Sequence, residues 1–471
     1  MFNRDRSKVM AALPELMRPL ANLVDENGML SGDDLASREP GWFIDKLRAD
    51  AVLRPTATEQ VAAILTYCNK HAIGVVPQGG MTGLVRATET EAGNIVLSLE
   101  RMNRIENIDI VGRTARVEAG VILQALQEKL AGCDLAFPLD LGARGSCQLG
   151  GNASTNAGGL RVVRYGMMRD LVLGIEAVLA DGTVVSSMNE MIKNNTGYDL
   201  KQLFIGSEGT LGIITRLVLR LYEAPKSRST ALVGVSRFEQ VTGLLKHMDS
   251  ALAGQLSAFE VMWNSFYAFN TRFLGDAPLG TNYPWYAVVE SLGGSPARDQ
   301  AQFEAALESA LEAGLVDDAI VAKSDTDAKR LWRVRESIES MMGRPAFVYD
   351  VSLPIVRMEA YIRELEKRLP RELPGCECGT FGHLADGNLH VVVLLDRDVR
   401  GGDLAELHVV SDRAVYEPLA AIGGSVSAEH GVGLEKKPYL PLSRSPAELA
   451  LMKRLKQLLD PNGILNPGKI F

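Results

Sequence analysis

Two of the histidines, His383 and His390, lie on either side of an Asp386-Gly387 pair. Asp-Gly is a strong signal for a two-residue hairpin turn, and that turn would place His383 directly opposite His390. The two imidazoles would then stand on one face of the hairpin, with Cβ atoms roughly 4.5–5.5 Å apart. This spacing suits two ligands of one metal ion, and it equally suits two rings stacked across the strands.

A second segment places a carboxylate next to a histidine. Within Ser425–Gly433, Glu429 is followed directly by His430. Two His and one Glu are a usual set of protein ligands for a catalytic Zn²⁺ ion, which keeps a further coordination position open. The two segments together therefore offer such a ligand set.

Glycine, with 45 residues, is concentrated at 79–83, 142–159, 206–212 and 423–433. Such runs indicate backbone that approaches a ligand closely. The N–H groups of residues 77–83 could hold phosphate, or these residues could form only a tight turn. Residues 138–166 contain too many Gly, Ser, Thr and Asn residues to build a core, and loops of this length are uncommon unless they are functional. Residues 195–214 have a similar composition.

The composition excludes several classes of protein. The net charge is −8, with 50 Lys and Arg against 58 Asp and Glu, and nucleic-acid binding needs clustered cations instead. Five cysteines in 471 residues do not make a disulfide framework. No stretch approaches the ~18–20 apolar residues of a membrane span, and the N-terminus lacks the apolar core of a signal peptide, so we expect a cytoplasmic protein. Neither a Rossmann fingerprint nor a P-loop occurs in a suitable context, which disfavours a nicotinamide enzyme.

The pattern of apolar residues indicates an α+β protein rather than a repeated βαβ unit. Before residue 222, strands are expected at 51–54, 74–77, 95–99, 115–118, 172–179, 183–186 and 213–221, with helices at 59–72 and 121–130. Further on, strands at 230–235, 284–292, 319–322, 348–353 and 389–395 alternate with helices at 238–252, 299–313, 325–342 and 357–369. This second rhythm predicts an antiparallel sheet with helices on one face. Helices are also expected at 403–420 and 446–459.

The segments 77–83, 138–166 and 195–214 together resemble the flavin domain of the vanillyl-alcohol-oxidase type of FAD enzymes, most closely the D-2-hydroxy-acid dehydrogenase branch. The resemblance runs from about residue 51 to residue 471. The first loop departs from the family pattern, because Met81 stands where Asn is usual and Arg86-Ala87 where Gly-Gly is usual. Gln148 stands where close relatives carry His, so we expect non-covalent FAD.

The resemblance implies a vanillyl-alcohol-oxidase type FAD-binding domain, followed by an antiparallel-sheet substrate domain with helices on one face. A polar, Pro-containing stretch after residue 221 marks the main boundary. The expected limits are an N-terminal helical segment at 1–44, the FAD-binding domain at 45–224, the substrate domain at 225–414 and a helical C-terminal segment at 415–471 that returns to the flavin site.

The resemblance also implies which residues bind FAD. The loops at 79–83 and 146–156 would hold the pyrophosphate, and residues 157–159 with Gly209 and Ile213 would line the isoalloxazine and ribitol. The full implied set is Pro77, Gly79, Gly80, Thr82, Gly83, Leu84, Pro138, Ser146, Gly150, Gly151, Asn152, Thr155, Asn156, Ala157, Gly159, Gly166, Glu208, Gly209, Gly212, Ile213 and Asn466.

For the chemistry, the resemblance implies that His383, His390 and Glu429 bind a divalent metal and that His430 transfers a proton and contacts substrate. Zn²⁺ is the expected ion, with Mn²⁺ and Fe²⁺ as alternatives. An imidazole with an unperturbed pKa of about 6.5 suits a general base at neutral pH. Arg335 corresponds to the substrate-binding arginine of the family, whose planar fork suits a carboxylate. Without the resemblance, an Arg335–Glu339 pair on a helix surface would be the simpler interpretation.

The expected reaction is oxidation of a D-2-hydroxy acid to the 2-keto acid, with hydride transfer to flavin N5. Enzymes of the branch that act on D-2-hydroxyglutarate carry Lys where this chain has Val348, and Asn where it has Val392. A second carboxylate buried without those partners is costly, so we expect a monocarboxylic substrate such as D-lactate, with D-2-hydroxyglutarate as the alternative.

The sequence does not reveal the electron acceptor. An electron-transfer flavoprotein, a quinone or a cytochrome would make the protein a dehydrogenase, and O₂ would make it an oxidase. A non-catalytic metal-binding or assembly protein that kept the fold is a further alternative, which the presence of His383, His390, Glu429 and His430 disfavours. A homodimer is expected from the family.

Overall fold

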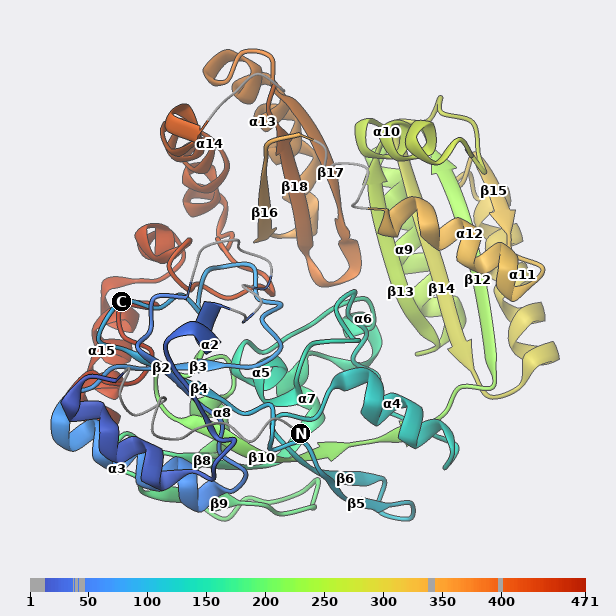
Figure 1. Ribbon diagram of the computed structural model, residues 1–471. Coiled ribbons are helices and arrows are strands. Elements are labelled where there is room, and N and C mark those ends of the chain that lie inside the picture. The colour runs from blue at the N-terminus through green and yellow to red at the C-terminus, as the bar shows by residue number, and fades with distance from the viewer. Residues whose placement is uncertain (1–12, 37, 39–40, 42–46, 338–343, 397–400) are drawn as a thin grey trace. The chain divides into compact units, whose positions relative to one another are not determined.

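Residues 13–36, 38, 41, 47–337, 344–396 and 401–471 are described by the computed structural model of the protein (Figure 1). By their internal contacts the residues divide into two compact units. The first comprises Met1–Gly159, Gly166–Ala224 and Glu429–Phe471, and the second comprises Leu160–Tyr165 and Pro225–Ala428. The four domain limits inferred from the sequence stay predictions.

The first unit is built around two sheets, with strand orders β1-β2-β4-β3 and β5-β6-β10-β8-β9. Its strands are β1 (Met29–Leu30), β2 (Ala51–Leu53), β3 (Val75–Gln78), β4 (Ile95–Ser98), β5 (Ile105–Asp109), β6 (Thr114–Glu118), β7 (Leu135–Ala136), β8 (Val172–Val178), β9 (Val184–Ser187), β10 (Ile213–Arg220) and β11 (Tyr222–Glu223). Its helices are η1 (Glu15–Leu23), α2 (Asp33–Ala36), α3 (Thr58–His71), α4 (Leu123–Ala131), α5 (Leu149–Ser154), α7 (Met168–Leu171), α8 (Lys201–Phe204), η5 (Lys437–Leu442) and α15 (Pro446–Leu459).

Helix α3 shows why the sequence pattern was informative in this unit. Val61, Ile64, Leu65 and Cys68 recur at helical spacing, and all four are fully buried. The chain's last residues also pack in this unit, because Leu465 forms a parallel bridge with Val75 at the start of β3.

The second unit contains one seven-stranded antiparallel sheet with the order β15-β12-β14-β13-β17-β18-β16. Its strands are β12 (Ser227–Val235), β13 (Leu256–Trp263), β14 (Trp285–Gly293), β15 (Asp318–Val321), β16 (Ala346–Ser352), β17 (Glu377–His383) and β18 (Asn388–Leu394). Its helices are α6 (Val162–Tyr165), α9 (Phe238–Leu252), α10 (Asn264–Leu274), α11 (Pro296–Glu312), α12 (Asp325–Glu336), η3 (Ile355–Arg357), α13 (Met358–Glu372), η4 (Leu384–Asp386) and α14 (Gly401–Ile422).

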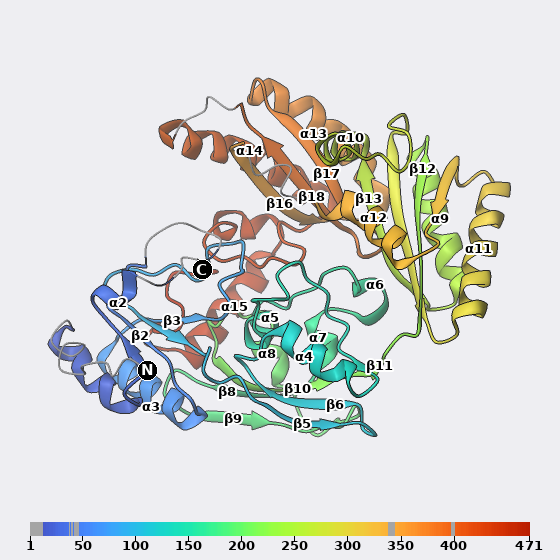
Figure 2. The same ribbon diagram turned by 45° about the vertical axis from the view of Figure 1, so that its right-hand side comes forward.

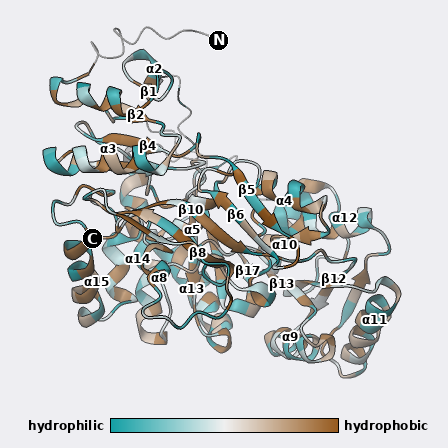
Figure 3. Ribbon diagram, turned by 90° about the horizontal axis from the view of Figure 1, so that it is seen from below, coloured by the Kyte–Doolittle hydropathy of each residue, from teal (hydrophilic) through white to brown (hydrophobic). Residues whose placement is uncertain are grey.

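This sheet carries helices on both faces rather than on one. Every residue of β13 is buried, whereas a strand covered on one side would alternate. On one face, Met262 packs with Phe266 of α10 and Trp332 of α12. On the other face, the Trp263 ring lies 5.8 Å from the ring of Phe238 in α9. Helix α11 runs beside α9 (Figure 2) and carries hydrophilic and hydrophobic residues together (Figure 3), as an amphipathic covering helix does.

One helix prediction needs correction, and another extends beyond the described residues. The described part of residues 1–44 is not the expected helical segment, because it contains only the 3₁₀ helix η1, the strand β1 and the one-turn helix α2. Pro19 lies inside η1, and a proline there removes a backbone donor that an α-helix would use. The helix expected at 325–342 is described as α12 up to Glu336, and residues 338–343 lie outside the described part of the chain.

Candidate active site

β17 and β18 carry His383 and His390, and their register differs from the prediction. His390 pairs with Phe381 and not with His383. Leu384–Asp386 forms a 3₁₀ turn, and Gly387 follows with a φ of 82°, so the predicted two-residue turn was wrong. A register shift of two residues keeps side chains on the same face. The imidazole rings of His383 and His390 accordingly remain neighbours, with centroids 5.3 Å apart.

Glu260 of β13 lies opposite His383 and was not singled out by the sequence analysis. Its Oε1 lies 2.6 Å from Nδ1 of His383, and its Oε2 accepts a hydrogen bond from Nε of Arg335 at 2.8 Å. Burial alone would raise the pKa of Glu260, but the charges of His383 and Arg335 outweigh it and lower that pKa. A carboxylate on Nδ1 fixes the ring orientation and directs Nε2 outward, which is the arrangement of a metal-binding histidine.

Arg335 of α12 is buried, with 5% of its surface exposed. Its guanidinium lies 4.3 Å from the centre of the Phe381 ring and 2.8 Å from Glu260. A surface pair with Glu339 does not fit this burial, and Glu339 itself lies outside the described residues. The role of Arg335 in substrate binding stays a prediction.

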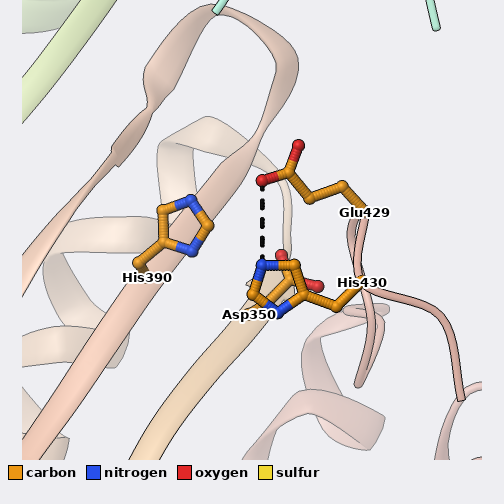
Figure 4. Close-up of side chains that lie close together, drawn as sticks. All are labelled: Asp350, His390, Glu429 and His430. Carbon is orange, nitrogen blue, oxygen red and sulfur yellow. Dashed lines mark ion pairs between the residues drawn. The ribbon is translucent and has the colours of Figure 1, made fainter. Parts of the chain in front are cut away.

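Glu429 and His430 directly follow a stretch of chain that is hydrogen-bonded to β16. The N–H of Ala428 donates to Oδ2 of Asp350 at 3.0 Å, so chain connectivity keeps the next two residues near this strand. Asp350 in turn pairs with His390 across β16 and β18. One ligand atom from each of Asp350, His390, Glu429 and His430 lies within 4.8 Å of the others (Figure 4).

The donor atoms of this group suit a divalent cation. Imidazole nitrogen and carboxylate oxygen are the donors that Zn²⁺, Mn²⁺ and Fe²⁺ share. Nε2 of His430 lies 3.9 Å from Oε1 of Glu429, and Oε2 of Glu429 accepts the N–H of Gly159 at 2.8 Å. The group includes two of the predicted ligands, His390 and Glu429, while His383 lies beside it. The predicted ligand set of His383, His390 and Glu429 is therefore still a prediction.

Asp350 is the member of the group that the sequence analysis did not select. It is fully buried, its Oδ1 accepts a hydrogen bond from Asn388 at 2.6 Å, and its Oδ2 accepts one from Ala428. Through these bonds Asp350 links β16 to Asn388 of β18 and to the backbone at Ala428. The sequence feature that could have identified Asp350 is its position two residues after Val348, on the same face of the same strand.

The glycine-rich loops of the first unit contribute much of the lining of a cavity that is open to solvent. Ten of the predicted cofactor residues line it: Pro77, Gly79, Gly150, Gly151, Thr155, Glu208, Gly209, Gly212, Ile213 and Asn466. Residues that the prediction lacked also line it: Gln78, Ala87, Thr88, Leu99, Ala119, Gln148, Ser154 and Ile214. Eleven predicted residues are not among its lining: Gly80, Thr82, Gly83, Leu84, Pro138, Ser146, Asn152, Asn156, Ala157, Gly159 and Gly166.

Buried polar atoms without a hydrogen-bond partner lie on residues that line this cavity or directly adjoin its lining. They include Oε1 of Gln78, Oε1 of Gln148, Oδ1 of Asn152 and Oδ1 of Asn466. Gly209 has a φ of +73°, and a Cβ there would come 2.4 Å from the Pro77 ring, so backbone passes closely at this wall of the cavity. Buried polar atoms are normally satisfied, and a polar ligand of extended shape would satisfy these. The residues present therefore fit FAD.

Comparison with known proteins identifies the family. Residues 49–187 match the model described as "FAD binding domain", and residues 224–470 match the model described as "FAD linked oxidases, C-terminal domain". The chain belongs to the FAD-linked oxidase family. This membership confirms the expected FAD-binding domain and an oxidoreductase, and it agrees with the cavity in the first unit.

The curated relatives of this chain cover most of its length. "D-2-hydroxyglutarate dehydrogenase, mitochondrial" of Bos taurus is 40% identical over 94% of this chain and 84% of its own. "D-2-hydroxyglutarate dehydrogenase" of Stutzerimonas stutzeri is 36% identical over 97% of this chain and 99% of its own. A Schizosaccharomyces pombe protein named "Putative D-lactate dehydrogenase" is 40% identical over 90% of this chain and 82% of its own.

Solved structures confirm the fold class of this chain. p-Cresol methylhydroxylase has a TM-score of 0.76 at 15% identity, covering 97% of this chain and 96% of its own. 4-Ethylphenol oxidase from Gulosibacter chungangensis has a TM-score of 0.73 at 18% identity, covering 98% and 96%. The vanillyl-alcohol-oxidase type fold with an antiparallel-sheet second part was therefore predicted correctly. Among the described residues, no helix is long and apolar enough to cross a membrane.

Proposed function

We propose that this protein oxidises a D-2-hydroxy acid to the corresponding 2-keto acid at a divalent metal ion. The observation that carries the proposal is the group of Asp350, His390, Glu429 and His430, with His383 beside it. Imidazoles and carboxylates at this spacing suit a metal that binds a hydroxy acid, and the relatives named above are D-2-hydroxy-acid dehydrogenases.

His383, His390 and Glu429 would hold the ion, preferably Zn²⁺, with Mn²⁺ and Fe²⁺ as alternatives. A bound ion would supply Lewis acidity toward the hydroxyl of the substrate. Non-covalent FAD would supply the acceptor for the hydride, at N5 of the flavin. Gln148, a side chain that forms no covalent link to flavin, lines the cavity and favours non-covalent binding.

His430 would take the hydroxyl proton as general base. Its imidazole is partly exposed, with 16% of the side-chain surface accessible, and it lies beside the carboxylate of Glu429. As the proton leaves, the Cα–H bond breaks with its electron pair and the C–O bond becomes a carbonyl. Arg335 would bind the substrate carboxylate through Nη1, because Nε and Nη2 both lie 2.8 Å from Oε2 of Glu260.

The substrate is proposed to be monocarboxylic, such as D-lactate. Val348 and Val392 pair across β16 and β18. They lie two residues along each strand from the Asp350–His390 pair, and therefore on the same face of the sheet. Val392 is 2% exposed and Val348 is 51% exposed. Neither side chain can supply the positive charge or the hydrogen bond that a buried second carboxylate of the substrate would need. D-2-Hydroxyglutarate remains the second candidate because relatives carry that name.

The visible spectrum under anaerobic conditions tests the proposed reaction. Purified protein is expected to show flavin bands that bleach with D-lactate and not with L-lactate. Bleaching with D-2-hydroxyglutarate alone would support the second candidate. Flavin bands that no D-2-hydroxy acid bleaches would contradict the proposed reaction.

The double variant Val348→Lys/Val392→Asn tests the proposed substrate side chain. A cation and an amide at these positions are expected to raise activity on D-2-hydroxyglutarate relative to D-lactate by about 10-fold or more. The measurement is the ratio of the two kcat/KM values, with Val356→Lys, at an exposed position outside the sheet, as the control. An unchanged ratio would contradict the role of these two positions.

We further propose an electron-transfer flavoprotein or a quinone as electron acceptor, a homodimer, and a cytoplasmic location. The acceptor can be tested by peroxide yield in air, because an O₂-using oxidase would form about one peroxide per substrate oxidised. Sedimentation of the purified protein tests the dimer, and cell fractionation tests the location.

A further inference from the structure

Glu208 is a buried carboxylate that contacts the turn following His430. It is 5% exposed and lies in the glycine-rich loop between α8 and β10. Its Oε1 accepts the N–H of Val432 at 2.7 Å, and its Oε2 accepts the N–H of Gly433 at 2.8 Å. Both oxygens of one side chain therefore hold two successive backbone amides.

The backbone of Glu208 is itself fixed on two sides. Its N–H donates to the carbonyl of Ser154 in α5 at 2.8 Å, and its own carbonyl accepts Nδ2 of Asn466 at 2.8 Å. Its φ is 52°, which is the left-handed region that residues with a side chain rarely occupy. Such a conformation persists where the surroundings over-determine it, and such positions cluster at functional sites.

The turn that Glu208 contacts contains two glycines in left-handed backbone, Gly431 with a φ of 91° and Gly433 with a φ of 50°. Glycine has many backbone conformations open to it, so contacts such as those of Glu208 help to select this one. A Cβ on Gly431 would come 2.8 Å from Oε1 of Glu208, which shows how closely the turn rests on this carboxylate. Burial raises the pKa of Glu208, while the two amides and the charge of Lys436 act against that rise.

We propose that Glu208 is a positioning residue for Glu429 and His430, acting through the backbone amides of Val432 and Gly433. Val432 follows His430 by two residues, so the amide bonds fix one end of the segment that carries the proposed base. The side chain of Glu429 is fixed separately, by the N–H of Gly159. This inference rests on the proposed function, because positioning Glu429 and His430 affects catalysis only if these two residues act in the reaction.

Glu208→Gln in the FAD-loaded protein tests the proposal. A carboxamide has one acceptor oxygen, so one of the two amides loses its partner while the side-chain volume stays the same. Hydrogen–deuterium exchange in a peptide covering 429–436 is expected to become at least about 10-fold faster. Anaerobic flavin reduction by the hydroxy acid is measured per bound FAD, because Glu208 also lines the flavin cavity. It is expected to slow by roughly 10- to 100-fold with KM little changed, because a small misplacement of a reacting group costs this much.

Two further variants keep the test decisive. Glu176→Gln changes another buried carboxylate of the first unit, which bonds Thr58 and Thr215, and should alter neither the exchange of 429–436 nor the reduction rate. Glu208→Asp keeps the charge but shortens the side chain by one methylene, which draws its oxygens away from the amides of Val432 and Gly433, and should reproduce both effects of Glu208→Gln. If Glu208→Gln does not fold, Glu208→Asp carries the test.

The outcomes separate this inference from the proposed function. Unchanged exchange at 429–436 in both variants would overturn the inference, and so would faster exchange with an unchanged reduction rate. His430→Ala tests the proposed base on its own, because it leaves Glu208 and its hydrogen bonds in place. If His430→Ala reduced flavin at the normal rate, the proposed function would fail, whatever the exchange data showed for Glu208.

Discussion

At the residue scale, Glu260 links two side chains that the sequence had singled out for different reasons. His383 was expected as a metal ligand and Arg335 as a substrate ligand, and both contact this one buried carboxylate. No sequence motif identifies Glu260, because its partners Arg335 and His383 are 75 and 123 residues away in the sequence. His383 and Arg335 could be named from the sequence as candidates, whereas the buried residue that contacts both was visible only in the fold.

The orienting role of Glu260 predicts weaker metal binding in the variant Glu260→Gln. Loss of the carboxylate frees the His383 ring, and loss of such an outer partner typically lowers metal affinity by about 10- to 100-fold. Competition with a chromogenic chelator measures that affinity, and FAD content is expected to stay unchanged.

Glu290→Gln is the matched control for this prediction. Glu290 is fully buried in the same sheet and bonds Arg161 and Nε1 of Trp332 instead of a histidine. Each variant leaves an arginine without its counter-charge, the buried Arg335 or the partly buried Arg161, and so loses stability, by up to about 3–5 kcal/mol. Equal metal affinity in the two variants would contradict the role assigned to Glu260.

At the element scale, the hairpin of β17 and β18 shows what a local pattern can and cannot predict. Asp386-Gly387 correctly marked a reversal of the chain, and the two strands and their shared face followed from it. The register was wrong because it is not set by the turn alone. β17 also pairs with β13 and β18 also pairs with β16, and these neighbours select the alignment.

Strand β13 was missed altogether, and its burial gives the reason. Alternation of apolar and polar residues signals a strand with one wet face, but β13 is buried on both faces and does not alternate. Its residue Glu260 was missed with it. The glycine-rich loops were easier to find, because close backbone approach constrains composition directly and does not depend on which strands lie nearby.

The start of helix α11 supplies a prediction on pH. Asp299 accepts hydrogen bonds from Oγ of Ser227 in β12 at 2.6 Å and from the N–H of Ser295 at 2.7 Å. The Ser227 hydroxyl and then the Ser295 N–H hold the pKa of Asp299 below its usual value. A carboxylate with a lowered pKa in the folded state stabilises the fold above its unfolded pKa of about 3.9 and loses that effect as the pH falls through the lower folded value.

We therefore expect Asp299→Asn to lower the Tm at pH 7, and the difference from the unchanged protein to shrink between about pH 4 and the lower folded pKa. Thermal unfolding at a series of pH values measures this. Asp249→Asn, at an exposed position of α9, is the control and should change the Tm little at any pH. A Tm difference that stays constant down to pH 3 would show that the charge of Asp299 does not stabilise the contact between β12 and α11.

At the scale of the whole molecule, the described FAD cavity and most of the proposed metal ligands belong to different units. All residues that line the cavity lie in the first unit, whereas His383 and His390 lie in the second. FAD binding and metal binding should therefore be separable. A chelator that removes the metal leaves the residues of the flavin cavity in place, while it removes the group that activates the hydroxyl of the substrate.

We expect treatment with a strong chelator to leave the flavin absorbance and its reduction by dithionite unchanged, and to slow reduction by the D-2-hydroxy acid by about 100-fold or more. Adding back Zn²⁺, Mn²⁺ or Fe²⁺ in turn should restore the rate, and the ion that restores it best identifies the physiological metal. His390→Ala is the matched variant, because it should keep FAD and remain inactive after metal is added. Release of FAD with the metal would show that the two units do not bind their cofactors independently. If protein shown to be free of metal still reduced its flavin with the D-2-hydroxy acid at the full rate, the metal would not be needed to activate the hydroxyl. That result would contradict the proposed mechanism.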